Sequence, residues 1–206
     1  MKALKRAWTK WQCKPFERFR EIDGWLTDNE ALALYQTARA LPSKSKIVEI
    51  GSWKGKSTFC LASGLQDGVI VAIDPFDAAG EAGSKEIYDG KKGDRPLLEQ
   101  FKENLNLNGL LEKIDIRKGY SADFAGSISD IDFLFIDGDH SQQGCEYDYR
   151  TFGPSVKKGG YLAFHDYDPK RMELGPTFVI ETIVKKEANW VFQRKADSLM
   201  LFRKAV

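Results

Sequence analysis

The residues best suited to chemistry are two histidines, each beside an aspartate. His140 follows the apolar run 131–137, and His165 ends the run 160–165. Short apolar runs of this kind predict buried strands, and open α/β sheets bind ligands at the carboxyl ends of their strands. A histidine with its ordinary pKa of about 6.5 can take a proton from a hydroxyl group. We therefore expect His140 and Asp137 to form a catalytic site.

A glycine-containing turn occupies residues 48–58, in the sequence VEIGSWKGKST. Glycine lets the backbone adopt a positive φ and pass close to a ligand, and a following helix offers free N–H groups. The spacing does not fit a P-loop, because Ile50 stands where the first glycine should be. It does not fit a dinucleotide turn either, because Trp53 and Lys56 replace the later glycines. A tight turn without a ligand remains an alternative.

Asp74 ends the next apolar run, 69–74, and lies 23 residues after Gly51. An acidic residue about 20 residues beyond a glycine turn hydrogen-bonds ribose hydroxyls in nucleotide-binding folds. A cap or turn role would also suit an aspartate at this place. Taken together, Gly51 and Asp74 favour a cofactor that contains ribose.

The positions of these residues require strands and helices that alternate along the chain. The expected strands are 46–50, 69–74, 114–118, 131–137, 160–165, 190–194 and 198–203, and the expected helices are 31–41, 56–64, 97–107, 122–128, 145–156 and 177–187. Thr27 and Glu30 have the spacing of a capping box before the first of these helices. The pattern predicts an α/β fold with a doubly wound, mostly parallel seven-stranded sheet and an antiparallel hairpin at its C-terminal edge.

The remaining segments predict a basic helical extension and one loop. Residues 27–206 are expected to form one domain, preceded by a helical extension at 1–26 with Leu4, Trp8 and Trp11 on one face. That helix would pack on the domain or on a second subunit of a homodimer, or would lie on an anionic membrane surface. Residues 77–95 are rich in glycine and charge and are expected to form a mobile lid.

Composition narrows the class of protein. The chain has 206 residues and a net charge of +1, which does not favour a nucleic-acid partner. No apolar run approaches the roughly 20 residues that span a bilayer. The three cysteines are Cys13, Cys60 and Cys145, and their spacing forms neither a disulfide framework nor a metal knuckle. We expect a protein of the reducing cytoplasm that acts on a small molecule.

Three blocks of sequence are similar to a known family: VEIGSWKGKST, VAIDPF and IDFLFIDGDHSQQGCEYDYRTFGPSVKKGGYLAFHDY. Residues 47–167 resemble the macrocin O-methyltransferase-like group of class I methyltransferases, which use S-adenosylmethionine. The resemblance implies that Asp74 holds the ribose and that Ser121 lies near the adenine. It implies that the turn faces the methionine part of the cofactor, through Glu49, Gly51, Ser52, Gly55 and Ser57.

The resemblance also implies a Mg²⁺ site. Related enzymes hold the ion with an aspartate after the fourth strand, here Asp137 or Asp139, and with an acidic or amide pair after the fifth, here His165 and Asp166. The histidine departs from that pair, since Mg²⁺ prefers oxygen ligands. We expect Asp139, His165 and Asp166 as ligands, and O-methylation of a sugar or another small-molecule hydroxyl. The alternatives are a hydroxylase-like enzyme of the same fold and a non-catalytic S-adenosylmethionine-binding module.

Overall fold

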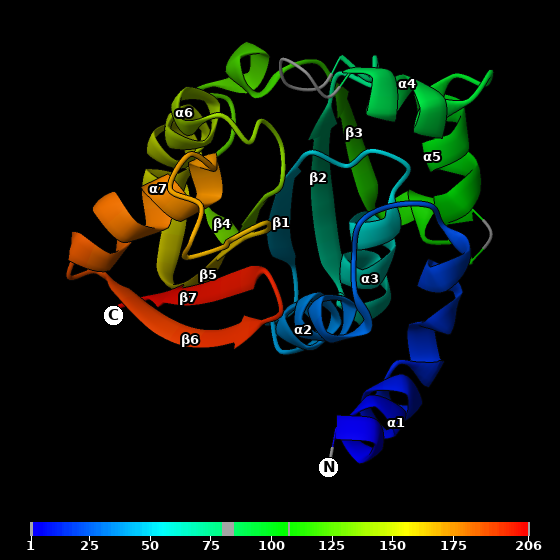
Figure 1. Ribbon diagram of the computed structural model, residues 1–206, viewed down its shortest axis with the longest axis horizontal. Coiled ribbons are helices and arrows are strands. Elements are labelled where there is room, and N and C mark those ends of the chain that lie inside the picture. Colours follow the sequence, from blue (N-terminus) through cyan, green and yellow to red (C-terminus); the bar gives the residue numbers. More distant parts are fainter. Residues whose placement is uncertain (1, 80–84, 107, 206) are drawn as a thin grey trace.

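The computed structural model describes residues 2–79, 85–106 and 108–205. Its centre is a seven-stranded sheet in the order β3-β2-β1-β4-β5-β7-β6 (Figure 1). The parallel strands are β1 (Ser45–Ile50), β2 (Gly68–Asp74), β3 (Ile114–Lys118), β4 (Ile131–Ile136) and β5 (Val156–Phe164). The hairpin of β6 (Trp190–Ala196) and β7 (Leu199–Lys204) joins antiparallel to β5. The predicted fold class is therefore confirmed.

Helices cover both faces of the sheet. The longer ones are α1 (Lys2–Gln12), α2 (Asp28–Arg39), α3 (Lys56–Gly64), α4 (Lys85–Lys92), α5 (Leu97–Asn106), α6 (Gln142–Phe152) and α7 (Gly175–Thr182). Short 3₁₀ helices are η1 (Lys14–Glu21), η2 (Leu111–Lys113), η3 (Ser121–Phe124), η4 (Gly153–Ser155) and η5 (Val184–Lys186). Alternate strand residues enter opposite cores: Ile47 packs in the core of α2, α3 and α5, and Val48 in that of α6 and α7.

The order of the strands reverses at β1, which pairs with β2 on one side and with β4 on the other. Chains leaving the carboxyl ends of β1 and β4 therefore diverge and leave a crevice between them. In Figure 1 these ends point to the top of the molecule. The predicted capping box stabilises the N-terminus of helix α2. In it, Thr27 Oγ1 accepts from Glu30 N, and Glu30 Oε2 accepts from Thr27 N at 2.8 Å.

Several expected elements differ in the structure, and one of them is the helix expected at 177–187, which ends at Thr182 before the short helix η5. The helix expected at 122–128 is only the turn η3, because Gly126 adopts a left-handed φ of +73° and ends it. Strand β5 begins at Val156 rather than at 160, since α6 ends at Phe152, before Pro154. The loop expected at 77–95 contains helix α4 at Lys85–Lys92, while residues 80–84 of that loop lie outside the described residues.

The predicted extension at 1–26 contributes to the domain core. Cys13, Phe16, Phe19 and Ile22 are buried in the same cluster as residues of α2 and α3. Helix α1 itself projects from the lower end of the molecule (Figure 1). Among the described residues, no helix is both long and apolar enough to cross a membrane.

Candidate active site

A cavity of about 600 Å³ opens at the carboxyl ends of the parallel strands. Its size is in the range of small-molecule sites, which are about 300 to 1,000 Å³. The structure places ten of the sequence-predicted residues in its wall: Gly51, Ser52, Ser57, Asp74, Ser121, Asp137, Asp139, His140, His165 and Asp166. Glu49 and Gly55 are absent from that wall.

Gly51 is required by the protein's own backbone. Its φ is +87°, and a Cβ built there would lie 2.1 Å from the carbonyl oxygen of Asp137. Glycine therefore allows the turn after β1 to pass directly beside the turn after β4. This contact brings the two parts of the cavity together, so Gly51 shapes the site through the backbone of Asp137.

Two predicted cofactor residues have structural roles instead. Gly55 also has a φ of +87°, but a Cβ there would meet Leu105 of α5 at 2.5 Å, away from the cavity. Glu49 is fully buried beneath the turn, where Oε2 accepts hydrogen bonds from Ser52 and Thr58. Burial raises the pKa of Glu49 to about 7, although those hydrogen bonds act in the opposite direction. These two residues hold the turn from behind.

Asp74 joins the turn to the end of β2. Its Oδ2 accepts from Ser52 N at 2.9 Å and from Trp53 N at 2.8 Å, and its Oδ1 accepts from Phe76 N at 2.6 Å. Burial raises the pKa of Asp74 despite these three backbone donors. A carboxylate has about four lone-pair directions, so one remains for a ligand in the cavity.

A second buried carboxylate lies beside Ser121. Ser121 Oγ donates to Asp148 Oδ1 on α6 at 2.5 Å, and both side chains line the cavity. Burial raises the pKa of Asp148 to about 6. Nearby, the Tyr120 hydroxyl donates to Asp77 at 2.8 Å. The part of the cavity wall that follows β3 therefore presents hydrogen-bonding groups from η3 and α6.

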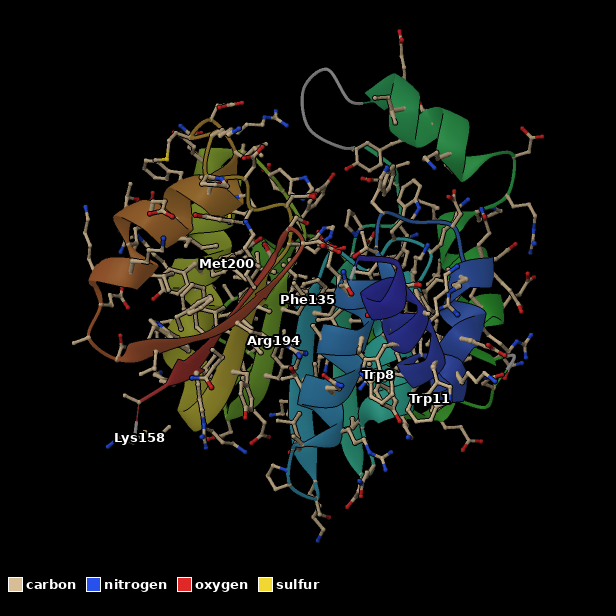
Figure 2. The ribbon with its side chains drawn as sticks, turned by 60° about the horizontal axis from the view of Figure 1, so that its bottom comes forward. Trp8, Trp11, Phe135, Lys158, Arg194 and Met200 are labelled. Carbon is tan, nitrogen blue, oxygen red and sulfur yellow. The ribbon has the colours of Figure 1, made fainter. Side chains whose placement is uncertain are left out.

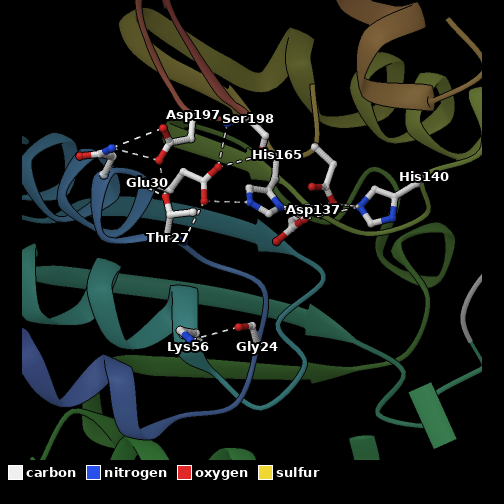
Figure 3. A network of polar contacts seen from close by, with 11 residues as sticks. Gly24, Thr27, Glu30, Lys56, Asp137, His140, His165, Asp197 and Ser198 are labelled. Carbon is white, nitrogen blue, oxygen red and sulfur yellow. Dashed lines mark hydrogen bonds and ion pairs between the residues drawn. The ribbon is translucent and has the colours of Figure 1, made fainter. Parts of the chain in front are cut away.

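His165 is enclosed by carboxylates. Its Nδ1 lies 3.1 Å from Asp137 and 3.4 Å from Asp166, and its Nε2 lies 3.4 Å from Glu30 of α2 (Figure 3). Burial alone would lower the pKa of His165, but the charge of Asp137 and the hydrogen bonds with these carboxylates outweigh it and raise the pKa. Both ring nitrogens of His165 face carboxylates, and His165 is not among the residues whose ligand atoms converge, so this geometry does not support its predicted metal-ligand role.

Glu30 ties this histidine to two other elements. Its Oε1 accepts from Ser198 N at 2.9 Å and from Ser198 Oγ at 2.6 Å, in the turn between β6 and β7 (Figure 3). Burial would raise the pKa of Glu30, but hydrogen bonding and charge from His165, together with Ser198 and Thr27, lower it to about 2. The α2 helix, the hairpin and β5 are thus joined through one carboxylate.

His140 faces the cavity beside two carboxylates. Its Nε2 lies 3.5 Å from Asp137 Oδ1 and 3.3 Å from Asp166 Oδ2. Asp166 adopts a left-handed φ of +58° as β5 ends, which aspartate tolerates. Burial would raise the pKa of Asp137, but the charge of His165 and hydrogen bonds from both histidines lower it to about 2. Ligand atoms of Asp137, His140 and Asp166 all lie within 4.8 Å of one another.

Asp139 does not join this cluster. Its side chain is exposed, and Oδ1 accepts from Ser141 N at 2.8 Å at the start of α6. Oδ2 lies against Gly144, where a Cβ would meet it at 2.2 Å. The predicted metal role of Asp139 therefore has no support in this geometry, and Asp137 is the aspartate that reaches the cluster.

Three aromatic rings form another part of the cavity wall. The centroid of Trp25 lies 5.8 Å from Trp53 and 5.4 Å from Tyr88, and those two lie 5.3 Å apart. All three line the cavity, and Trp53 Nε1 is buried without a hydrogen-bond partner among the described residues. Lys91 of α4 lies over the Trp25 ring and pairs with Asp23 at 3.1 Å.

Several of these residues could not be assigned to the site from the sequence alone. Glu30 was identified only as part of a capping box, and nothing in a single sequence links it to His165. Asp148 follows Cys145 by three positions, so the helical period predicts a carboxylate on the buried face of that helix, which is the signal that could have drawn attention to it. Trp25 and Trp53 stand in glycine-containing turns beside the predicted site, which is a weaker signal.

The strand order and the cavity at the carboxyl ends are those of a class I methyltransferase fold, and solved structures agree. A methyltransferase from Geobacter sulfurreducens superposes with a TM-score of 0.64 at 19% identity, over 97% of this chain and 87% of the other. The O-methyltransferase TomG from Streptomyces achromogenes, solved with S-adenosylmethionine, gives 0.63 at 17% identity, over 96% and 89% of the two chains.

Sequence comparison gives the family. Residues 48–167 match the family model described as a methyltransferase domain, and the chain belongs to this family. A protein of Acanthamoeba polyphaga mimivirus is 32% identical over 133 residues, which are 60% of this chain. The chain spans about half the length of that curated relative, 52%.

Proposed function

We propose that this protein transfers a methyl group from S-adenosylmethionine to a hydroxyl group of a small molecule. The observation that carries the proposal is the cavity itself, which joins the glycine turn at Gly51 and Asp74 to the cluster of Asp137, His140 and Asp166. The sulfonium of the cofactor supplies an electrophilic methyl group. The chain must orient an acceptor oxygen in line with that group and remove the hydroxyl proton.

The cofactor would lie across the carboxyl ends of β1, β2 and β3. We assign its amino-acid part to the backbone around Gly51 and Ser52, and its ribose to the remaining lone pair of Asp74. Its adenine would lie near Ser121 and Asp148. This assignment keeps the glycine turn and Asp74 as cofactor groups, and leaves Glu49 and Gly55 as support.

His140 is the proposed base. Asp137 and Asp166 lie within 3.5 Å of its Nε2 and would stabilise the imidazolium that forms when it takes the proton. As the acceptor oxygen bonds to the methyl carbon, the bond from carbon to sulfur breaks and S-adenosylhomocysteine leaves. Proton transfer by a positioned side chain contributes about 10² to 10⁴ in rate.

A divalent cation is the alternative to a base role for His140, because an imidazole nitrogen that binds an ion cannot also take the hydroxyl proton. Two carboxylate oxygens and one imidazole nitrogen fit Mn²⁺ or Zn²⁺ better than Mg²⁺, which prefers oxygen ligands alone. Such an ion supplies a charge that lowers the pKa of a bound hydroxyl. Asp137, His140 and Asp166 would hold it, in place of the expected Asp139 and His165. Iron oxygenases use two histidines and one carboxylate, so hydroxylase chemistry has less support here.

The acceptor is proposed to carry a flat ring face, as a sugar or an aromatic compound does. Trp25, Trp53 and Tyr88 offer aromatic surface for stacking, and the buried N–H of Trp53 can donate to an acceptor oxygen. The resemblance to the macrocin-like group is consistent with a hydroxylated natural product. A panel of hydroxylated sugars and phenols would identify the acceptor.

Calorimetry followed by a methyl-transfer assay tests the proposal. We expect S-adenosylmethionine and S-adenosylhomocysteine to bind, and ATP and NAD not to bind. Activity that survives exhaustive chelation would assign the proton to His140 without an ion, whereas activity lost and restored by Mn²⁺ or Mg²⁺ would assign the cluster to a metal. Absence of S-adenosylmethionine binding would refute the proposed function.

A further inference from the structure

Helix α1, at the lower end of the molecule in Figure 1, exposes two tryptophans. Trp8 is 60% exposed and Trp11 is 59% exposed. Their rings stack on each other, with centroids 5.0 Å apart and an angle of 25° between planes. Figure 2 shows both rings together on the N-terminal helix. Two stacked, exposed tryptophans form a contiguous apolar surface, and contiguous exposed apolar surface marks an interaction site.

The other side of α1 is already used by the fold. Thr9 Oγ1 donates to Asn29 at 3.1 Å, and the Cys13 thiol lies 3.6 Å from the carbonyl oxygen of Asp28. Cys13 is fully buried, one helical turn after Thr9. The contact with α2 thus fixes the rotation of α1, and the two tryptophans point away from the domain.

The charge around these tryptophans is strongly positive. The first 20 residues contain seven lysines and arginines and one glutamate, while the whole chain has a net charge of +1, so residues 21–206 carry −5. Lys10 and Lys14 are exposed beside Trp11. Tryptophan rings settle at the boundary between lipid headgroups and acyl chains, and clustered lysines attract anionic headgroups.

We propose that α1 is a peripheral anchor that docks this protein on an anionic phospholipid surface. Trp8 and Trp11 enter the headgroup region, and the basic residues of the segment contact lipid phosphates. A second copy of the chain is a poorer occupant, because pairing α1 with itself would bring together two segments with a net charge of +6 each. The carboxyl ends of the parallel strands, where the cavity opens, point to the top of Figure 1, whereas α1 lies at the lower end, so docking of α1 leaves the cavity open to solvent.

Vesicle sedimentation with the full chain tests this proposal independently of the methyl-transfer reaction. One vesicle type contains phosphatidylcholine alone, and the other contains phosphatidylcholine mixed with phosphatidylglycerol. We expect at least about tenfold tighter binding to the mixed vesicles, and weaker binding at high salt because screening reduces the attraction. Equal binding to both types, or binding to neither, would overturn the proposal.

Variants locate the surface. The double change Trp8→Ala and Trp11→Ala should lower vesicle affinity at least about tenfold, and Lys10→Glu with Lys14→Glu should do the same. Val191→Ala with Phe192→Ala is a matched control, since these two β6 residues are 51% and 53% exposed. Thermal unfolding that matches the unchanged protein shows that the variants fold. A control that weakens binding equally, or a dimer that depends on Trp8 and Trp11, would contradict the proposal.

Discussion

The ends of β4 and β5 carry the same two residue types, yet the structure gives their histidines opposite surroundings. The His140 side chain is 18% exposed and faces the cavity between Asp137 and Asp166. The His165 side chain is 4% exposed and lies between Asp137 and Glu30. Both histidines contact Asp137, so the difference in their surroundings comes from Glu30, which α2 places beside His165 at the end of β5. A third partner decides which histidine is available for proton transfer.

Asp137 is shared by both histidines, and its change should have the largest effect. Asp137→Asn keeps the shape but removes the charge that faces His140 and His165. We expect methyl transfer to fall by about 10³-fold, within the range for disabling acid–base catalysis, while affinity for S-adenosylhomocysteine changes little. Steady-state kinetics and calorimetry measure the two quantities. A variant with most of its activity would show that the cluster is not catalytic.

The two histidines should separate activity from stability. His140→Ala should lower the rate by about 10² to 10⁴ and change the free energy of unfolding by less than about 1 kcal/mol. His165→Ala leaves Glu30 and Asp137 without their buried partner and should cost about 3–5 kcal/mol of stability. Denaturant unfolding beside kinetics checks both. The comparison fails if His165→Ala is as stable as His140→Ala.

The pH dependence of stability sharpens the contrast between Glu30 and Glu49, which are both buried. The pKa of Glu30 is lowered to about 2. Its contribution to the free energy of unfolding is therefore fully present above the ordinary pKa of 4.5 and is lost as the pH falls toward 2. The pKa of Glu49 is raised to about 7, so the folded state holds its proton longer and stability falls as the pH rises from about 5 to 7.

Glu30→Gln should therefore destabilise the protein at pH 7 and make its stability less dependent on pH below 4.5. Glu49→Gln should remove the decline between about pH 5 and 7. Melting temperatures measured from pH 3 to 8 for both variants check the opposite signs. Parallel profiles would mean that the two carboxylates share one environment.

The sequence allowed the sheet, its parallel core and the edge hairpin to be predicted, because apolar runs and their order along the chain determine them. It also located the cavity, since parallel strands place their carboxyl ends together. The direction of side chains beyond those ends was not predictable. Gly55 lies against α5 and Asp139 against α6, because the helices packed against each turn, rather than the spacing within it, set the direction.

Contacts between residues far apart in the sequence could not be predicted either. Glu30 meets His165 only because the fold brings the start of α2 beside the residue that follows β5, and a single sequence carries no sign of that contact. The metal set predicted from resemblance therefore named His165 and Asp139, where the geometry groups Asp137, His140 and Asp166. Helix α4 could not be predicted because it is short and, beside Gly90 and many charges, offers only Ile87 and Tyr88 as apolar residues.

Asp139 offers the smallest expected effect and the sharpest check on which aspartate after β4 belongs to the site. Its carboxylate accepts from Ser141 N and lies at the start of α6, where a negative charge stabilises a helix by about 0.3–1 kcal/mol. Asp139→Ala should lose about that much stability and keep methyl transfer within about threefold of the unchanged protein. Asp166→Ala is the matched comparison, because Asp166 contacts His140 at 3.3 Å and should lose most activity. If Asp139→Ala instead loses as much activity as Asp166→Ala, Asp139 must turn from α6 into the cavity during the reaction, and the ligand set implied by the resemblance would be restored.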